Sequence, residues 1–198
     1  MCTIRRKAFL GDKRITNAIV PEGTVTIEDW AYAHCKLLSK IFIPDTIRNI
    51  SGKIFDGCDI LSEVHIYKGD ETLNDSPHLL ALSVKAWKND LEDMIVNAKE
   101  PTAFYKVFDL RLIKYLDEPD DVGFDPFLAG GEEDYEDDDN DIELFIRNRQ
   151  LDKCILIYER FLSEKNGYII DDDNKATFVS YLKTRRLTHA FDALLREN

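Results

Sequence analysis

Long apolar runs are missing from this chain of 198 residues, although 44% of its residues are hydrophobic. A membrane-spanning helix needs about 20 consecutive apolar residues, and no window of that length is free of charged residues. Residues 1–14 are charged where a secretory signal would be apolar. We therefore expect a cytoplasmic protein with no membrane partner, whose hydrophobic residues form a core.

Cysteine and histidine are scarce, with four residues of each type. No two cysteines form a C-x-x-C pair, and no histidine stands at metal-ligand spacing from a cysteine. None of the histidines belongs to a recognisable nucleophile motif, and Gly130-Gly131 lacks the lysine of a phosphate-binding loop. The sequence therefore predicts no metal site, no cofactor and no catalytic residue, so we expect a protein that is not an enzyme.

Clustered basic residues are also missing, and the net charge is −12. The segment from Asp117 to Glu143 holds 14 acidic residues and no Lys or Arg, so the rest of the chain carries the difference, a charge of about +2. Nucleic-acid backbones attract clustered Lys and Arg, so no nucleic-acid partner is expected. An EF-hand register fails because Ile142 and Asn148 occupy its glycine and glutamate positions. We expect a disordered, solvated loop at about 117–141.

The sequence instead contains a repeat with a period of 23 residues. Sliding the chain by 23 residues places Val20-Pro21 on Ile43-Pro44 and Cys35 on Cys58. Other apolar positions recur in register, pairing Ile27 with Ile50, Tyr32 with Phe55, Leu38 with Leu61, Ile41 with Val64, and Ile43 with Ile66. A partial copy comes first, with Ala8-Phe9 falling on Ala31-Tyr32. A fixed period of this kind is the signature of a stacked repeat architecture.

The shared pattern, I-P-x-x-[IV]-x-x-I-x-x-x-A-[FY]-x-x-C-x-x-L-x-x-[IV]-x-[IV], resembles the 23-residue BspA-type (Treponema-type) leucine-rich repeat over residues 4 to about 67. Ile54 stands where the family has alanine. The resemblance implies a non-enzymatic protein–protein interaction module and leaves the protein partner unnamed. Each copy would form one coil, so we expect a short leucine-rich-repeat solenoid with a small parallel β-sheet.

The alternating pattern within each copy separates an inner from an outer face of this sheet. Leu38, Ile41 and Ile43 should point inward, whereas Lys40 and Phe42 should point outward. By the same register, the outward row consists of Asn17, Ile19, Lys40, Phe42, Glu63, His65 and Tyr67. Exposed apolar residues in a row tend to mark contact sites, so these are the candidate binding residues. The alternative is that the chain's own helices cover them.

Stacking also brings equivalent positions of neighbouring coils close together. Cys35 and Cys58 should lie about 5 Å apart, where a disulfide is sterically possible but two reduced, stacked thiols are expected. The first coil leaves an open edge, and Arg5, Arg6 and Lys7 would protect it from pairing with other strands. The same N-terminal edge could instead pair with a second molecule to form a structural homodimer.

Helical periodicity replaces the repeat after residue 70. One helix should begin at Ser76-Pro77 and continue through Met94, covering the open end of the repeat sheet. Further helices are expected at Thr102–Leu116, Asp141–Asn148, Leu151–Lys165, Asp173–Lys183 and Leu187–Arg196. The fold class is therefore α+β, with repeats in residues 1–70 and an all-α domain in residues 71–198. An enzyme or effector remains the alternative, with a site in the helical half near His189, Arg185 and Glu159.

Overall fold

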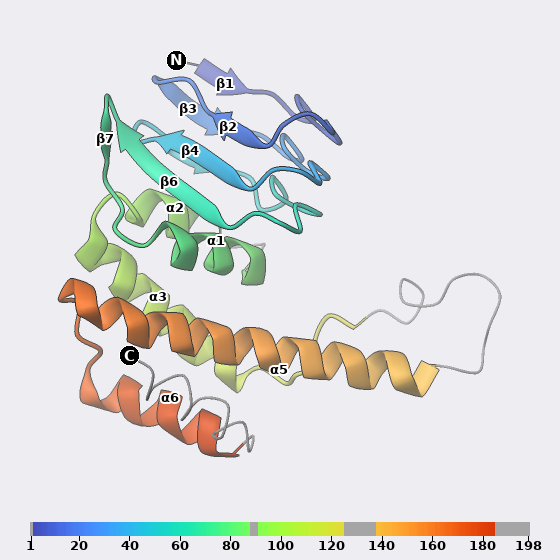
Figure 1. Cartoon of the computed structure of the whole chain (residues 1–198), viewed down its shortest axis with the longest axis vertical. Helices are drawn as coiled ribbons and strands as arrows, with labels where there is room; N and C mark the ends of the chain where they lie inside the picture. The colour runs from blue at the N-terminus through green and yellow to red at the C-terminus, as the bar shows by residue number, and fades with distance from the viewer. Residues whose placement is uncertain (1, 88–90, 125–137, 185–198) are drawn as a thin grey trace. The chain divides into compact units, whose positions relative to one another are not determined.

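The computed structural model describes residues 2–87, 91–124 and 138–184 (Figure 1). The chain divides into two compact units, Met1–Phe108 with Lys165–Tyr168, and Asp109–Glu164 with Ile169–Asn198. Within the described residues there are two β-sheets and five α-helices, which confirms the α+β class. The first unit runs beyond residue 70, where the sequence places a domain boundary, so that boundary stays a prediction.

The first sheet of unit 1 follows the predicted repeat register. Strands β2 (Asn17–Ile19), β4 (Lys40–Pro44) and β6 (Glu63–Lys68) are parallel neighbours, and β7 (Glu71–Thr72) pairs antiparallel with β6. Each residue of β4 pairs with residues 23 positions away, as Lys40 does with Asn17 on β2 and with Glu63 on β6. One sequence period therefore equals one step across the sheet.

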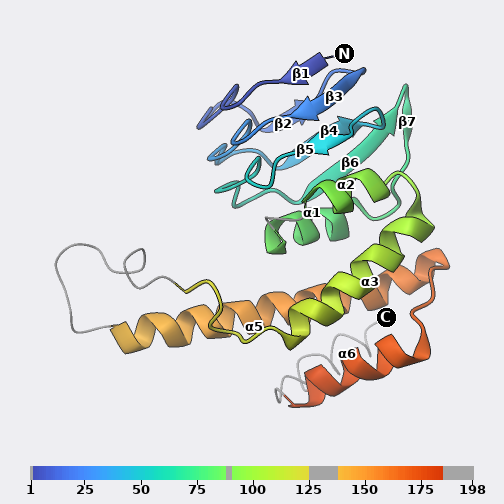
Figure 2. The ribbon, with the colours of Figure 1, turned by 180° about the vertical axis from the view of Figure 1, so that it is seen from behind.

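A second parallel sheet, which the sequence did not predict, lies in the same unit (Figure 2). It consists of β1 (Cys2–Ile4), β3 (Thr24–Ile27) and β5 (Asn49–Ile50), and pairs Ile4 with Ile27 and Ile27 with Ile50. These strands span only two to four residues, which is too short for an alternating pattern to stand out. Each period thus adds one strand to each of two sheets.

The core between the two sheets is filled by the consensus positions of the repeat. The predicted inward residues are all buried, as are their counterparts in the next copy: Leu38, Ile41, Ile43, Leu61, Val64 and Ile66. Phe9, Tyr32 and Phe55 form an aromatic ladder, with ring centroids 4.9 and 6.5 Å apart. Burial of apolar side chains is the main stabilising contribution in such a stack.

The two repeat cysteines are free thiols, as expected, and they connect consecutive coils. Sγ of Cys35 donates to the carbonyl of Phe9 at 3.0 Å, and Sγ of Cys58 donates to the carbonyl of Tyr32 at 3.1 Å. Burial raises the pKa of the Cys58 thiol to about 11. These thiols therefore act as buried hydrogen-bond donors between coils.

The last coil is covered by a cap that begins with Asn74. Its side chain accepts from the backbone N–H of Ile66 at 2.8 Å and donates to the carbonyl of Val64 at 2.9 Å, which satisfies backbone groups of β6. Helix α1 (Pro77–Ala86) packs against β6, and α2 (Leu91–Asn97) packs against β5. The prediction that the first helical segment covers the end of the sheet is therefore confirmed.

The prediction of one continuous helix through Met94 is wrong, because α1 ends before Trp87 and α2 begins at Leu91. Both helices bury their apolar residues in the same unit, including Leu80 and Val84 of α1 and Leu91 and Met94 of α2. The three- and four-residue spacing continues through the break, so periodicity alone does not reveal it.

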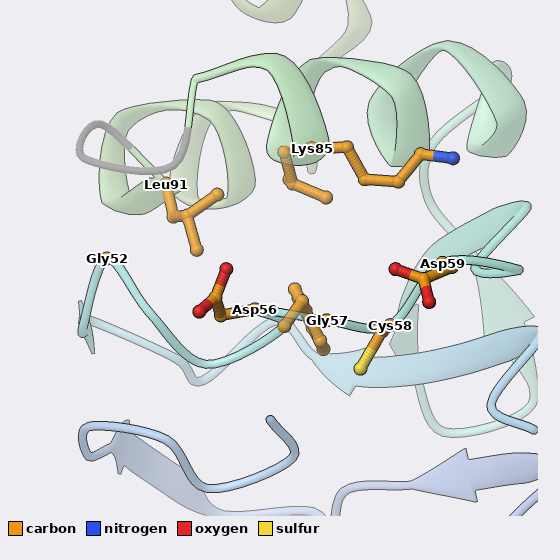
Figure 3. Close-up of a pocket in the computed structure, with 9 residues that line it drawn as sticks. Gly52, Asp56, Gly57, Cys58, Asp59, Lys85 and Leu91 are labelled. Carbon is orange, nitrogen blue, oxygen red and sulfur yellow. The ribbon is translucent and has the colours of Figure 1, made fainter. Parts of the chain in front are cut away.

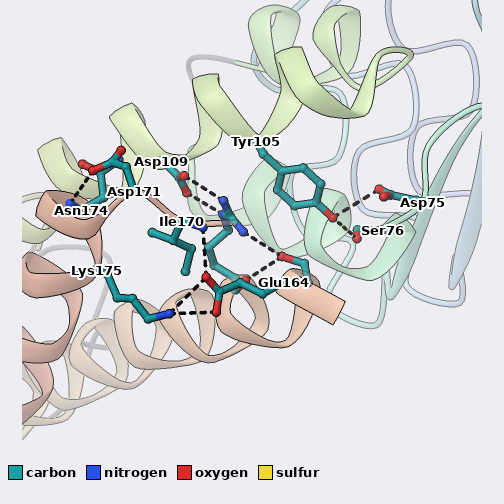
Figure 4. A network of polar contacts seen from close by, with 11 residues as sticks. Asp75, Ser76, Tyr105, Asp109, Glu164, Ile170, Asp171, Asn174 and Lys175 are labelled. Atoms are coloured by element: carbon teal, nitrogen blue, oxygen red, sulfur yellow. Dashed lines mark hydrogen bonds and ion pairs between the residues drawn. The ribbon is translucent and has the colours of Figure 1, made fainter. Parts of the chain in front are cut away.

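Helix α3 (Pro101–Asp117) confirms the predicted helix at residues 102–116 and contributes residues to both units. In unit 1, Phe108 packs edge-to-face on the buried Trp87, with ring centroids 5.2 Å apart. The hydroxyl of Tyr105 bonds to Ser76 at the start of α1 and to Asp75 at 3.2 Å (Figure 4). These contacts attach the start of α3 to α1.

Unit 2 is built on α5 (Asp138–Leu162), which is followed by a short 3₁₀ segment (Ser163–Asn166) and by α6 (Asp172–Thr184). Two helices were predicted at 141–148 and 151–165, and the structure shows one helix of 25 residues. Arg149 and Gln150 occupy the predicted break, but their side chains bind Glu118 and Asp120 at 2.8 Å each. These polar side chains bind the loop that precedes α5, and the helix continues through them. The predicted helix at 173–183 is confirmed by α6, and the one at 187–196 lies outside the described residues.

The predicted disorder at about 117–141 is wrong at both ends. Residues 117–124 are placed, and α5 begins at Asp138, whereas residues 125–137 lie outside the described part of the chain. Asp120 is buried and forms an ion pair with the fully buried Lys153 at 2.7 Å. Nζ of Lys153 also donates to the carbonyl of Glu118 at 2.7 Å. A buried lysine with two acceptors holds this loop against α5.

A second buried ion pair joins α3 to α5 within unit 2. Nε and one Nη of Arg160 donate to the two carboxylate oxygens of Asp109 at 2.6 and 2.9 Å (Figure 4). Burial raises the pKa of the Asp109 carboxyl, and the contact with Arg160 opposes that rise. Nearby, Glu164 accepts from the backbone N–H of Ile170 at 3.0 Å and pairs with Lys175. These contacts fix the turn that leads into α6.

Candidate interaction surface

The outward side chains of the first sheet form the candidate site, which we call the sheet-face row. Its members are the seven predicted residues Asn17, Ile19, Lys40, Phe42, Glu63, His65 and Tyr67. The strand register places them in ranks that run across the sheet. Asn17, Lys40 and Glu63 share one rank, and Ile19, Phe42 and His65 share the next. Tyr67 lies beside Pro44, further along the strands.

The charged members of the row neutralise each other. Nζ of Lys40 lies 2.7 Å from one oxygen of Glu63, and Nε2 of His65 lies 2.7 Å from the other oxygen. The hydrogen bond from Lys40, followed by the one from His65, lowers the pKa of Glu63. A partner that approaches this face meets a nearly neutral surface.

The rank of Ile19, Phe42 and His65, which we call the apolar rank, carries the aliphatic and aromatic side chains of the row. The rings of Phe42 and His65 stack with centroids 4.6 Å apart and planes at 11°. Ile19 continues the rank on β2 and is 70% exposed. Helices α1 and α2 of unit 1 therefore do not cover Ile19, although cover by the chain's own helices was the alternative left open by the sequence. A large aliphatic side chain in this setting is typical of a contact surface.

Tyr67 has a structural contact that the sequence did not predict. Its hydroxyl donates to the carbonyl of Val20 at 2.7 Å, which lies two strands away. In a regular ladder that carbonyl would accept from residue 44, but Pro44 has no N–H. Burial, followed by the charge of Glu22, raises the pKa of Tyr67. The hydroxyl of Tyr67 is thus engaged inside the repeats.

Two exposed apolar residues next to the row were missed by the sequence reasoning. Leu37 and Ile60 are 48% and 51% exposed, and they share one repeat position, three residues before the starts of β4 and β6. We call them the rim pair. Beside them, Nζ of Lys36 pairs with Asp59 at 2.6 Å. The available signal was an apolar residue that recurs directly before the buried consensus leucines Leu38 and Leu61.

A small cavity of about 100 Å³ lies between the last coil and the cap (Figure 3). The acidic residues in its lining are Asp56 and Asp59, whose carboxylates lie on opposite sides of the cavity in the close-up. Cys58 also lines it, and its raised pKa keeps the thiol protonated near neutral pH. The Cys58 thiol is therefore not an activated nucleophile. The alternative enzyme site included Arg185 and His189, which lie outside the described residues.

Among the described residues, no three His, Cys, Asp or Glu side chains come together as a potential metal site. Within that same part of the chain, no helix has the length and apolar character needed to cross a membrane.

The comparison with known families supports the repeat assignment within unit 1. A family model described as "BspA type Leucine rich repeat region (6 copies)" matches residues 2–80. Residues 2–80, which are less than half of the chain, are therefore similar to a BspA-type leucine-rich repeat region. Such leucine-rich repeat regions generally act in protein interaction or adhesion and are typically non-enzymatic. The matched repeat region extends past β6 into α1. No curated protein and no solved structure matches the chain.

Proposed function

We propose that the repeat region is a short solenoid that binds an apolar segment of another protein through the sheet-face row and the rim pair. Residues 1–70 carry the binding surface, and residues 71–198 form the helical part. The observation that carries the proposal is the apolar rank of Ile19, Phe42 and His65, in which Ile19 is largely exposed.

The chemistry of the partner follows from the charges of the row. Lys40, Glu63 and His65 already pair with one another, so a charged partner would have to compete with those contacts. Burying apolar surface contributes about 25 cal/mol per Å² to the binding free energy, and it does not require these ion pairs to break. An uncharged, apolar segment therefore fits this surface better than an acidic or basic one.

A second copy of the chain is the other occupant to be weighed. Ile19 lies on β2, which ends the first sheet among the described strands, so a homodimer would also bury it. In the enzyme alternative, the repeats would serve as a recognition arm for a site in the helical half. The cavity described above does not favour that alternative, because its thiol, Cys58, stays protonated near neutral pH.

The test compares two exposed isoleucines. Tagged wild type, Ile19→Asp and Ile169→Asp are used for affinity purification, and bound proteins are identified by mass spectrometry. Ile169 lies in unit 2 and is 73% exposed, so it matches Ile19 in type and exposure. We expect a bound protein that is lost with Ile19→Asp and retained with Ile169→Asp.

Light scattering of the wild type and of Ile19→Asp distinguishes a protein partner from a second copy of the chain. A wild-type dimer that Ile19→Asp dissociates identifies a second copy. Identical bound proteins for all three chains would overturn the proposal.

A further inference from the structure

A group of cationic side chains surrounds Trp30, at the turn that follows β3. We call Arg6, Lys7, Trp30 and Lys53 the Trp30 cluster. Cζ of Arg6 lies 4.7 Å from the ring centroid, and Nζ of Lys7 and of Lys53 lie 5.3 and 5.8 Å from it. Lys7, Trp30 and Lys53 occupy the same position in three successive copies of the repeat. The cluster is therefore a product of coil stacking.

The backbone holds this turn in an uncommon conformation. Lys7 and Trp30 have φ angles of +61° and +56°, in the left-handed region that non-glycine residues seldom adopt. The N–H of Lys7 donates to the carbonyl of Asp29 at 3.1 Å, which fixes the turn against the next coil. A non-glycine residue in the left-handed region is strained, and such strain tends to persist at functional sites.

Several other cations of the repeat region form ion pairs with carboxylates, and those of the cluster do not. Arg14, Lys36, Lys40 and Lys68 each pair with a carboxylate. Among the described residues, no carboxylate pairs with Arg6, Lys7 or Lys53, whose side chains are exposed.

The two nearest acidic side chains in the sequence are engaged by other donors. Glu28 accepts from the backbone N–H of Arg6 at 2.8 Å, and Asp29 accepts from the hydroxyl of Ser51. The charged groups of Arg6, Lys7 and Lys53 thus have the indole ring as their shared protein contact. A cation–π contact holds a cation near the ring but leaves its N–H donors available.

We propose that the Trp30 cluster binds a phosphate group. Three cations that surround one ring repel each other, and a group with two negative charges relieves that repulsion. A phosphate has several acceptor oxygens, which suit a bidentate guanidinium and two ammonium groups. A nucleic-acid backbone would need a line of such clusters, and this is a single one. The group could belong to free phosphate or to a phosphorylated protein segment.

The indole N–H of Trp30 can report on binding at the cluster, because the chain has two tryptophans and the other, Trp87, is buried. An NMR spectrum of the ¹⁵N-labelled full chain should show two indole N–H peaks, which Trp30→Phe assigns. We expect titration with inorganic phosphate to move the Trp30 peak and leave the Trp87 peak in place. Sodium chloride at equal ionic strength should move neither peak. Equal movement with chloride, or no movement with phosphate, would overturn the proposal.

Two double variants decide whether the cluster itself is responsible. Lys7→Ala with Lys53→Ala should weaken phosphate binding at least about 10-fold, since each removes a charge-assisted contact. Lys13→Ala with Lys106→Ala removes the same charge from exposed positions outside the cluster and should leave binding unchanged. Equal weakening by both variants would overturn the proposal.

Titration with a phosphoserine peptide distinguishes the two sources of the phosphate group. If the peptide moves the Trp30 peak at a lower concentration than free phosphate does, the source is a phosphorylated protein segment. If both act at the same concentration, the source is free phosphate.

Discussion

Cysteine chemistry at the residue scale is set by burial, and the first prediction follows from it. Cys2 is exposed, whereas Cys35, Cys58 and Cys154 are buried. The thiolate is the reactive form, and the pKa of Cys58 is raised to about 11, so little thiolate forms there below that pH. We expect a disulfide reagent to modify one thiol per native chain rapidly and all four in denaturant. Raising the pH from 7 to 9 should leave Cys58 unmodified, as peptide mapping will show. Rapid native labelling of Cys58 would contradict its role as a buried donor.

The second prediction concerns the carbonyl of Val20, which Pro44 leaves without a ladder donor. Tyr67→Phe removes the hydroxyl that satisfies it and should lower the free energy of unfolding by about 1–3 kcal/mol. Urea unfolding followed by circular dichroism measures the loss. Pro44→Ala restores an N–H at the ladder position, so adding it to Tyr67→Phe should recover part of the loss. If the double variant is as unstable as the sum of the two single variants, the assignment of this contact is wrong.

At the scale of the repeat element, one position in every copy turns with a positive φ. Gly11, His34 and Gly57 occupy it, with φ angles of +68°, +58° and +68°. The His34 ring lies directly where a Cβ on Gly57 would be placed. Glycine tolerates this backbone conformation without strain, and other residues do not.

The third prediction uses this neighbour pair. Gly57→Ala should destabilise the protein by more than Gly69→Ala, which has a positive φ but open space around it. Gly69→Ala should cost about 1 kcal/mol for the backbone alone. In a His34→Gly background the ring is gone, so the cost of Gly57→Ala should fall toward that of Gly69→Ala. Thermal unfolding of the wild type and these four variants tests this, and an unchanged cost of Gly57→Ala in the His34→Gly background would refute the contact.

The fourth prediction tests the inner and outer faces of one coil with adjacent residues. Leu61 is buried, and Leu61→Ala should cost about 2–5 kcal/mol because it opens a cavity between coils. Ile60 is exposed, so Ile60→Ala should change stability by less than about 0.5 kcal/mol. Urea unfolding distinguishes the two. Similar losses for both variants would mean that the coil is out of register.

How far the sequence predicts these elements depends on how local their signals are. The 23-residue period is local and repeated, so it predicted the register that joins Ile19, Phe42 and His65. The end of α1 at Ala86 was not predicted, because the apolar spacing continues past it. The single helix α5 was divided wrongly, because Arg149 and Gln150 look like a break until their partners on the preceding loop are known. Those partners are more than 20 residues away and leave no local signal.

At the scale of the whole molecule, the sequence predicted the α+β class and the change from repeats to helices. It did not predict the second sheet or the buried charges of unit 2. Charged residues are normally exposed, so nothing in the sequence marks Lys153 or Arg160 as fully buried. Only their distant partners, Asp120 and Asp109, explain their burial. The sheet-face row was predicted by register, whereas the rim pair and the Trp30 cluster depend on exposure and on contacts between coils.

The fifth prediction concerns the ion pair between Asp109 and Arg160, which lie 51 residues apart and join α3 to α5. Replacing Arg160 alone with Met leaves a buried carboxylate without its partner, which should cost about 3–5 kcal/mol of the free energy of unfolding. Replacing both residues, as Asp109→Leu with Arg160→Met, removes the unpaired charge and should recover most of that loss. Urea unfolding of the full chain provides the measurement. A double variant no more stable than Arg160→Met would show that Arg160 contributes mainly through Ser163 and its packing, and that the carboxylate is not its essential partner.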